Sequence, residues 1–307
     1  MVFCDDAGRE NEGTTSVKFG TDTQGWRSAG VWLLRIFAAT LVIGSLASTT
    51  DLNQWWIRIW DFPRVQILLA MIASAIALWV FDRAWRPWIP LALLVACAWQ
   101  AYRVFPYTFL APTEVGRVAE ADRSGDGCFS MLTLNVLQKN REYDRTIELI
   151  ERVDADIVLL TETDQAWVDA VAPVLSRYES QLARPLDNTY GILFATRLPM
   201  RDAEIRDFAQ EDTPSVLATL RVDRQDFRVI GLHPRPPQPK QDTEERDAEL
   251  VMAARMTQDL EMPVMAIGDF NDVAWSDTTR LFTDTPPFLQ FETMKELPPD
   301  IRELLTQ

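Results

Sequence analysis

Apolar positions are distributed differently in the two parts of this sequence. As far as residue 105 they form three long runs, whose only charges, Arg35 and Arg103, lie near the run ends. The runs are Val31–Ala47, Val65–Phe81 and Trp88–Val104. Each is near the lower limit of the about 17–25 residues with which a helix crosses a bilayer. Tryptophans gather at their edges, as in the aromatic belt of membrane proteins. The pattern predicts three transmembrane helices, with the bilayer as a partner of residues 31–104.

Two other structures fit apolar runs of this length. A buried helical hairpin of a soluble protein has the same periodicity, although three runs in succession favour membrane helices. A cleaved signal peptide also contains an apolar run. Here, however, the first run follows a polar leader, two more runs come after it, and no small-residue cleavage site separates them from the rest of the chain.

Lysine and arginine are unevenly distributed over the polar segments beside the runs. The leader and the second connection together carry more of them than the first connection, and basic loops stay in the cytoplasm. They are Arg9, Lys18 and Arg27 in the leader, Arg83 and Arg86 in the second connection, and Arg58 and Arg64 in the first. This bias predicts a multi-pass protein of the inner (plasma) membrane, with everything after residue 105 on the extracytoplasmic face.

From Gly127 onward, short β-type runs alternate with amphipathic helical patterns. The predicted strands are Phe129–Val136, Asp156–Thr161, Gly191–Thr196, Ser215–Val222, Phe227–Leu232 and Val264–Ile267. The predicted helices are Glu142–Arg152, Gln165–Ser176, Asp242–Leu260 and Ser276–Phe282. This order predicts a mixed α/β layered fold. The sequence then divides into a polar cytoplasmic leader (1–28), a three-helix membrane anchor (29–106), a second domain (127–285) and an atypical tail (286–307).

The composition of the chain disfavours some kinds of binding partner for the second domain. The chain has 45 acidic and 30 basic side chains, a formal net charge of −15. Non-specific duplex binding depends on basic side chains that neutralise phosphates, so avid binding of this kind is not expected. Anionic lipid would also repel an acidic domain unless a metal mediates the contact. Cys4, Cys97 and Cys128 lie in different segments, so no disulfide is predicted, and Cys128 is expected to be buried.

Polar side chains stand at the ends of four predicted strands. Asn135 ends MLTLN, Glu162 follows DIVLLT, His233 follows VIGL, and Asp269 and Asn271 follow VMAIG. The carboxyl ends of such strands meet at one sheet edge, where ligands bind. Each residue alone has an ordinary explanation as a turn, a cap, a solvated strand end or a structural histidine. Together they supply oxygen ligands for Mg²⁺ or Mn²⁺, a carboxylate for activating water, and donors for phosphoryl oxygens.

Five segments carry a more specific resemblance. They are TLNV, LLTE, YGILFATRLP, GLHPRPP and GDFND, the last followed by WS after two residues. In this order they resemble the successive motifs of the endonuclease/exonuclease/phosphatase family, and its membrane-anchored bacterial branch most closely, over roughly residues 128–283. The resemblance implies a four-layer α/β/β/α sandwich and an enzyme that hydrolyses phosphoric esters with a divalent metal. The α/β domain would follow the three transmembrane helices.

The resemblance also implies a metal site. Glu162 would be the principal ligand of Mg²⁺ or Mn²⁺, supported by Asn135 and Asp269. The partner would be a phosphoester: a nucleic acid, a lipid head group or a small phosphodiester, among which the sequence does not choose.

The same resemblance implies catalytic roles. His233 would touch the phosphate, Asp269 would orient or activate the water, and Asn271 would position the phosphate as a donor. Tyr190, directly before the GILFATRLP strand, is a further candidate for the phosphate site.

The C-terminal part of the sequence departs from the family pattern. The family ends with further strands and a Ser-Asp-His-type motif, whereas this sequence continues after Phe282 without such a motif and has one histidine, His233. The departure implies a truncated or diverged chain, a sandwich incomplete at its C-terminal end, and a tail that folds loosely or as a helix. Loss of one member of a concerted catalytic unit costs orders of magnitude in rate, so impaired activity is expected.

Two alternatives to an active hydrolase follow from this departure. The domain could be a non-catalytic binding or scaffold module that retains the fold, which the missing second histidine favours and the retained polar set opposes. It could also serve only the assembly of a small membrane protein, which the intact set of motifs disfavours. Metal-dependent hydrolysis of a generic phosphodiester separates an active enzyme from both.

Overall fold

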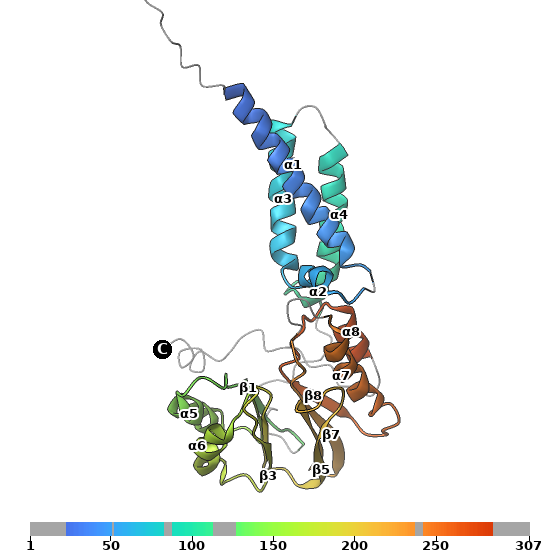
Figure 1. Ribbon diagram of the computed structural model, residues 1–307. Helices are drawn as coiled ribbons and strands as arrows, with labels where there is room; N and C mark the ends of the chain where they lie inside the picture. Colours follow the sequence, from blue (N-terminus) through green and yellow to red (C-terminus); the bar gives the residue numbers. More distant parts are fainter. Residues whose placement is uncertain (1–22, 51, 83–87, 113–126, 237–241, 285–307) are drawn as a thin grey trace, which may run out of the picture.

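The structure, a computed structural model, describes residues 23–50, 52–82, 88–112, 127–236 and 242–284 (Figure 1). Three helices are long and apolar enough to cross a membrane, as the apolar runs predict. They are α1 (Thr23–Ala47), α3 (Arg64–Phe81) and α4 (Trp88–Val104). Short helical segments follow two of them: α2 (Trp55–Arg58) and η1 (Ile59–Asp61) after α1, and η2 (Phe105–Tyr107) after α4. Residues 23–112 are called the three-helix region below.

The three long helices pack through a narrow apolar seam and present apolar side chains outward. The seam consists of Ala38, Leu41, Ile67, Met71, Leu78, Leu93, Ala96 and Cys97. Large side chains such as Leu33, Leu69 and Leu94 are each more than 60% exposed on the outer faces. Soluble proteins rarely expose contiguous apolar surface on this scale. An apolar surrounding suits the outer faces better than water does.

Charged side chains of the three-helix region have specific partners. Arg35 donates from Nε and Nη2 to the two oxygens of Asp82, at 2.6 and 2.8 Å. Arg103 donates from Nη2 to the backbone oxygen of Trp275 and to Oδ1 of Asp277, both at 2.7 Å. Both arginines lie near the ends of their apolar runs, and the structure gives each a partner. The partner of Arg103 lies in the second domain.

The second domain contains two four-stranded sheets. The first has the order β1 (Met131–Asn135), β2 (Ile157–Thr161), β4 (Ile192–Thr196), β3 (Ser180–Arg184). The second has the order β5 (Met200–Asp207), β6 (Pro214–Val222), β7 (Gln225–Leu232), β8 (Val264–Gly268). The pairs β1–β2 and β7–β8 are parallel, and the other pairs are antiparallel. The sequence patterns predict six of these strands and miss β3 and β5.

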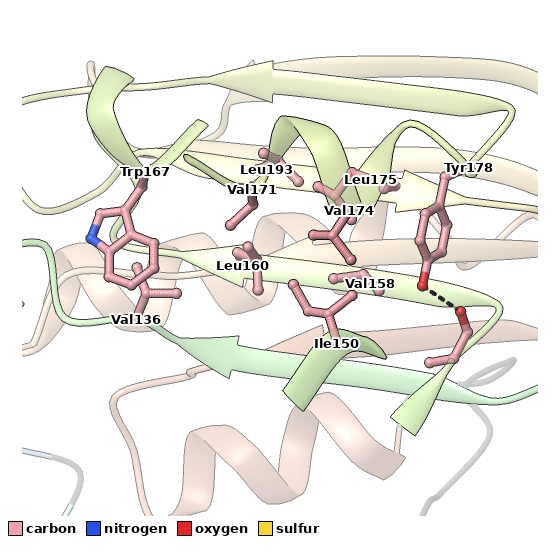
Figure 2. Close-up of a cluster of buried hydrophobic side chains, with 12 residues drawn as sticks. Val136, Ile150, Val158, Leu160, Trp167, Val171, Val174, Leu175, Tyr178 and Leu193 are labelled. Carbon is pink, nitrogen blue, oxygen red and sulfur yellow. Dashed lines mark hydrogen bonds between the residues drawn. The ribbon is translucent and has the colours of Figure 1, made fainter. Parts of the chain in front are cut away.

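Three apolar cores stack the elements into layers. Between the sheets, side chains such as Leu159 and Phe194 of the first sheet meet Val216 and Val229 of the second. Helices α5 (Tyr143–Val153) and α6 (Gln165–Leu175) cover the outer face of the first sheet around the fully buried Trp167 (Figure 2). Helices α7 (Glu244–Arg255) and α8 (Asp277–Asp284) cover the second sheet. The fold is thus the predicted four-layer α/β/β/α arrangement.

The three-helix region contacts the second domain through a set of hydrogen bonds called the docking contact below. Trp275 Nε1 donates to the Asp61 backbone oxygen at 2.6 Å, beside the bonds of Arg103. Thr243 N donates to the Asn53 oxygen at 3.0 Å. An isolated antiparallel β-bridge also joins Gln54, in the α1–α3 connection, to Asp242. The domain-side residues of these contacts, Asp242, Thr243, Trp275 and Asp277, all lie near the start of α7 or α8.

Cys128 was expected to be buried but is exposed, because it lies just before β1 and outside the packed layers. Of the expected leader (1–28), the structure describes residues 23–28. The expected tail (286–307) lies outside the described residues, and so does the expected absence of closing strands there.

A buried carboxyl gives a pH-dependent test of the fold. Glu249 on α7 is 2% exposed, and it accepts hydrogen bonds from Ser215 Oγ (2.7 Å) and Ala209 N (2.9 Å). Burial raises its pKa above the ordinary value of 4.5. The folded state therefore binds this proton more tightly than the unfolded state, and the associated stability is lost as pH rises through the folded pKa.

Glu249→Gln is neutral, of the same shape, and able to serve both hydrogen-bond partners. We expect the variant to have a higher free energy of unfolding than the parent at pH 7, and a weaker dependence of that free energy on pH. Urea unfolding of the detergent-solubilised protein, followed by tryptophan fluorescence across the pH range, measures both. The exposed Glu204→Gln is the matched control. A Glu249→Gln protein that is less stable at pH 7 would contradict this account of the buried charge.

Candidate functional site

Four strand ends meet at one edge of the two packed sheets. The parallel pairing aligns Asn135 with Thr161 in the first sheet and Leu232 with Gly268 in the second. Parallel strands end at the same edge, so the residues that follow β2, β7 and β8 gather beside the end of β1. These residues are Glu162, His233 and Asp269. The edge therefore holds candidate residues from both sheets.

The side chain of Asn135 joins two carboxylates. Its Nδ2 donates to Glu162 Oε1 at 2.7 Å and to Asp269 Oδ2 at 3.1 Å. Its Oδ1 accepts from Leu137 N at 3.0 Å. Gln138 N donates to the second oxygen of Glu162 at 3.2 Å. The structure thus brings together all three residues named as a metal site, with the Asn135 amide nitrogen facing the carboxylates. Direct ligation by the Asn135 oxygen would require the amide to turn over.

His233 is buried beside these carboxylates. It is 2% exposed, and among the described residues its Nδ1 has no hydrogen-bond partner. Burial lowers the pKa of His233 below 6.5, and the charges of Asp269 and Glu162 oppose that shift. The lowered pKa keeps the imidazole neutral at pH 7. A neutral ring with an unused buried nitrogen is suited to accept or donate one hydrogen bond to a ligand.

Tyr190 and Arg235 stand beside the histidine. The Tyr190 ring centroid lies 5.5 Å from that of His233, and the Arg235 guanidinium carbon lies 4.8 Å from the Tyr190 ring centroid. Arg235 is held by Thr213 Oγ1 and the Glu211 backbone oxygen, each at 2.8 Å. A positive charge over the tyrosine face is favourable and fixes both side chains. The arrangement places Tyr190 between the histidine and a cation.

Hydrogen bonds of Asn271 stabilise the loop after β8. Its backbone N donates to Asp269 Oδ1 at 3.1 Å, and its Nδ2 donates to the Pro234 oxygen at 2.9 Å. Arg246 lies on α7 and is 4% exposed. It donates to the backbone oxygen of Asn271 and forms an ion pair with Asp272 Oδ1 at 3.1 Å. Asn271 therefore ties Asp269 to the segment that carries His233. One amide proton of its Nδ2 group is left for a ligand.

Backbone strain is concentrated at this edge. Four non-glycine residues around the site have positive φ: Leu137 (56°), Glu162 (62°), Thr189 (71°) and Asn271 (49°). Such conformations cost about 1–3 kcal/mol each and persist where the surroundings impose them, often at functional sites. Gly268, at φ 136°, directly precedes Asp269, and a Cβ there would lie 1.9 Å from the Leu232 oxygen. Only glycine allows β7 and β8 to end this close together.

The side chains at this edge include few of the groups that hold a divalent metal. Within the described residues, no group of three or more His, Cys, Asp and Glu side chains is placed to hold an ion. Two carboxylates and an amide do converge. Mg²⁺ is commonly bound by one or two carboxylates, with waters and substrate phosphate completing its shell. The residues at this edge fit an ion of that kind and do not form a closed protein cage.

The structure adds three residues that the sequence patterns miss. Gln138 and Arg246 support Glu162 and Asn271, and Arg235 lies over Tyr190. Arg235 belongs to the HPRPP stretch, so its proximity to His233 could have been inferred. Gln138 acts through its backbone, and Arg246 lies in an ordinary charged helix, so neither has a sequence signal.

Known proteins show which family the second domain resembles. A family model described as the endonuclease/exonuclease/phosphatase family matches residues 132–300, more than half of the chain. No curated protein sequence matches the chain.

Similar solved structures include D. rerio TDP2 in complex with a single-strand DNA product (17% identity, TM-score 0.44). The alignment covers 52% of this chain and 66% of that one, just under two thirds. The human Nocturnin catalytic domain with a bound sulfate anion is also similar (18% identity, TM-score 0.42). That alignment covers 51% of this chain and 70% of the Nocturnin chain. A third similar structure is Sphingomyelinase C from Streptomyces griseocarneus (17% identity, TM-score 0.40). The alignment covers 50% of this chain and 68% of the sphingomyelinase chain. With the family model matched over most of the second domain, the chain belongs to the endonuclease/exonuclease/phosphatase family.

Proposed function

We propose that this protein is a membrane-anchored, divalent-metal-dependent phosphoesterase that cleaves phosphodiesters. The observation that carries the proposal is the bridge from Asn135 to the carboxylates of Glu162 and Asp269, next to buried His233, whose Nδ1 has no hydrogen-bond partner among the described residues. Two acidic groups at one edge beside a neutral imidazole match the needs of phosphate-ester hydrolysis. Family membership supports a phosphoric-ester hydrolase in general terms.

The carboxylates supply the metal site. Glu162 and Asp269 would hold Mg²⁺ or Mn²⁺, and Asn135 would keep the two carboxylates in place. When bound, the ion supplies Lewis-acid polarisation of a phosphoryl oxygen and offsets the charge that develops there. Hydrogen bonds from Asn135 Nδ2 and Gln138 N hold the two oxygens of the Glu162 carboxylate, so little rearrangement is needed when the ion binds.

The remaining polar side chains act on the phosphate and the water. His233, neutral at pH 7, offers Nδ1 to a phosphoryl oxygen or to the attacking water. Asp269 orients that water, while Asn271 and Tyr190 border the phosphate position. In the reaction the water oxygen bonds to phosphorus, one ester P–O bond breaks, and the leaving oxygen takes up a proton. The products are a phosphomonoester and an alcohol.

Turnover is expected to be slow. The sequence contains one histidine, so proton transfer depends on His233 and Asp269 without a second imidazole. Electrostatic stabilisation of the transferring phosphoryl group requires no titrating side chain, so it persists with this reduced set. A domain that binds the metal but cleaves no diester would instead be the non-catalytic binding module.

Replacement of Glu162 tests the metal site. Glu162→Gln keeps the size of the side chain and its acceptor for Gln138 N but removes the charge. We expect metal-dependent hydrolysis of bis(p-nitrophenyl) phosphate by the detergent-solubilised protein to fall below detection, and His233→Ala to lower kcat by about 10²–10⁴-fold. Chelator should abolish the parent's activity. The exposed Glu148→Gln on α5 should have no effect.

Binding is measured separately from turnover. Mn²⁺ should raise the melting temperature of the parent protein and not that of Glu162→Gln, since an ion that binds only the folded state stabilises it by mass action. Turnover that persists in chelator, or that survives Glu162→Gln, would rule out the proposed site.

We also propose that α1, α3 and α4 span the membrane, with the second domain on the extracytoplasmic side. Their length and apolar surfaces support the spans, and the lysine and arginine bias of the short flanks supports the direction. An odd number of crossings separates the N-terminal segment from the domain.

Reporter fusions test this direction. A reporter that is active only outside the cytoplasm should be active when fused after Gln307 and silent when fused after Asp82. A cytoplasm-specific reporter at the same two positions should give the opposite pattern and serves as the control. Activity of the first reporter only after Asp82 would move the domain into the cytoplasm.

A further inference from the structure

The docking contact involves the same segments that carry the candidate site. Trp275, which donates to the Asp61 oxygen, and Asp277, which accepts from Arg103, lie on the chain just after Asp269. The Tyr107 and Trp275 rings also meet edge to face, with centroids 5.9 Å apart. The loop that begins with Asp269 at the sheet edge therefore ends against the three-helix region.

The start of α7 contacts the three-helix region as well. Asp242 and Thr243, which precede α7, bond to Gln54 and Asn53 of the α1–α3 connection. One turn further on, Arg246 donates to the Asn271 oxygen. The loop after β8 and the residues just before α7 thus both contact the three-helix region. In Figure 1, α7 and α8 lie between the sheets and the long helices.

The ends of the long helices nearest the domain carry exposed apolar and aromatic side chains. Trp56 is 55% exposed, Phe62 43% and Phe109 86%. Further examples are Leu52, Trp55, Ile59, Tyr107 and Leu110. Tryptophan and tyrosine side chains prefer the boundary between lipid and water. On the proposed topology this level is the membrane surface, and the site edge of the sheets faces it.

Charge argues against a polyanion as substrate. Non-specific binding of nucleic acid draws its free energy from phosphate neutralisation by basic side chains, and this chain has a net charge of −15. A lipid head group needs no such general attraction, because the bilayer holds it beside the site at high local concentration.

We infer that the substrate is a phosphodiester borne by a lipid of the membrane in which the protein sits, and that the docking contact presents the site to that lipid. The inference rests on the proposed phosphoesterase function. Water adds to the lipid phosphorus, one of its two ester P–O bonds breaks, and the leaving alcohol oxygen takes a proton. The phosphate stays with one product as a monoester.

The first experiment compares one chemical group from two sources. The full chain is reconstituted with Mg²⁺ in vesicles of phosphatidylcholine, phosphatidylethanolamine and phosphatidylglycerol, and new phosphomonoester is followed by ³¹P NMR. The second source is the matching water-soluble glycerophosphodiesters, and bis(p-nitrophenyl) phosphate and a single-stranded oligonucleotide serve as further soluble substrates. We expect faster cleavage of the bilayer diester than of its soluble counterpart.

The outcomes separate this inference from the proposed function. Cleavage of bis(p-nitrophenyl) phosphate or of the glycerophosphodiesters, with the vesicle lipid left intact, would overturn the lipid inference and leave the phosphoesterase standing. Preferred cleavage of the oligonucleotide would overturn it in favour of nucleic acid. No cleavage of any substrate would remove the proposed function, and the inference with it.

The second experiment breaks the docking contact away from the site. Trp275→Phe removes the indole N–H bonded to Asp61, and Arg103→Gln removes the ion pair with Asp277. We expect the double variant to lose about ten- to a hundredfold in bilayer cleavage through lost orientation, and to keep the parent rate on bis(p-nitrophenyl) phosphate. Arg152→Gln, which breaks the exposed pair with Glu148 on α5, is the matched control. Equal loss on both substrates would show that the contact shapes the site itself, which contradicts the inference.

The third experiment measures orientation without catalysis. A fluorophore is attached at Lys139→Cys, on the exposed loop after β1, or at Asp223→Cys, in the turn between β6 and β7 at the opposite edge, in a chain with its three cysteines replaced by alanine. Lipids with spin-labelled head groups should quench the first label more strongly than the second. Equal quenching, or stronger quenching at position 223, would overturn the inference whatever the activity.

Discussion

The candidate site depends on one amide group that holds two like charges together. Asn135 ends β1 of the first sheet and Asp269 directly follows β8 of the second, so the bridge through Nδ2 exists only while the sheets stay packed face to face. Repulsion between Glu162 and Asp269 favours separation. The apolar core between the sheets, which includes Leu159 and Phe194, opposes it. The stability of the fold and the electrostatics of the site are therefore coupled, and a cation between the carboxylates would relieve the strain.

Much of the fold follows from the sequence because the buried elements have regular apolar patterns. Strands such as β2 and β4 are buried on both faces and appear as unbroken apolar runs. The strands that the patterns miss, β3 (SQLAR) and β5 (MRDAEIRD), lie at sheet edges and have exposed positions, which are charged in β5 and are Gln181 and Ala183 in β3. Edge strands are half solvated, so their polarity resembles that of a loop. Which strands pair within each sheet is decided by tertiary contacts, so the local sequence gives no signal for it.

The site was predictable to the extent that it lies at strand ends. The positions of Glu162, His233 and Asp269 follow from the apolar runs before them, whereas the direction of each side chain does not. Three-dimensional contacts decide that the Asn135 nitrogen faces the carboxylates and that the Asn271 amide binds the Pro234 oxygen. Burial of His233 beside the Tyr190 ring, with no hydrogen-bond partner for its Nδ1 in the described part of the chain, likewise depends on tertiary contacts.

The docking contact has a consequence for how the protein is made. Trp275 and Asp61 are 214 residues apart, and Arg103 and Asp277 are 174 apart, so these bonds wait for nearly the whole described chain. Contacts of such separation form late because a long loop must close first. Asp269 emerges from the ribosome in the same late segment. On the proposed topology, the long helices enter the bilayer before the two carboxylates can meet. A nascent chain would carry no assembled hydrolytic centre while it is still on the cytoplasmic side.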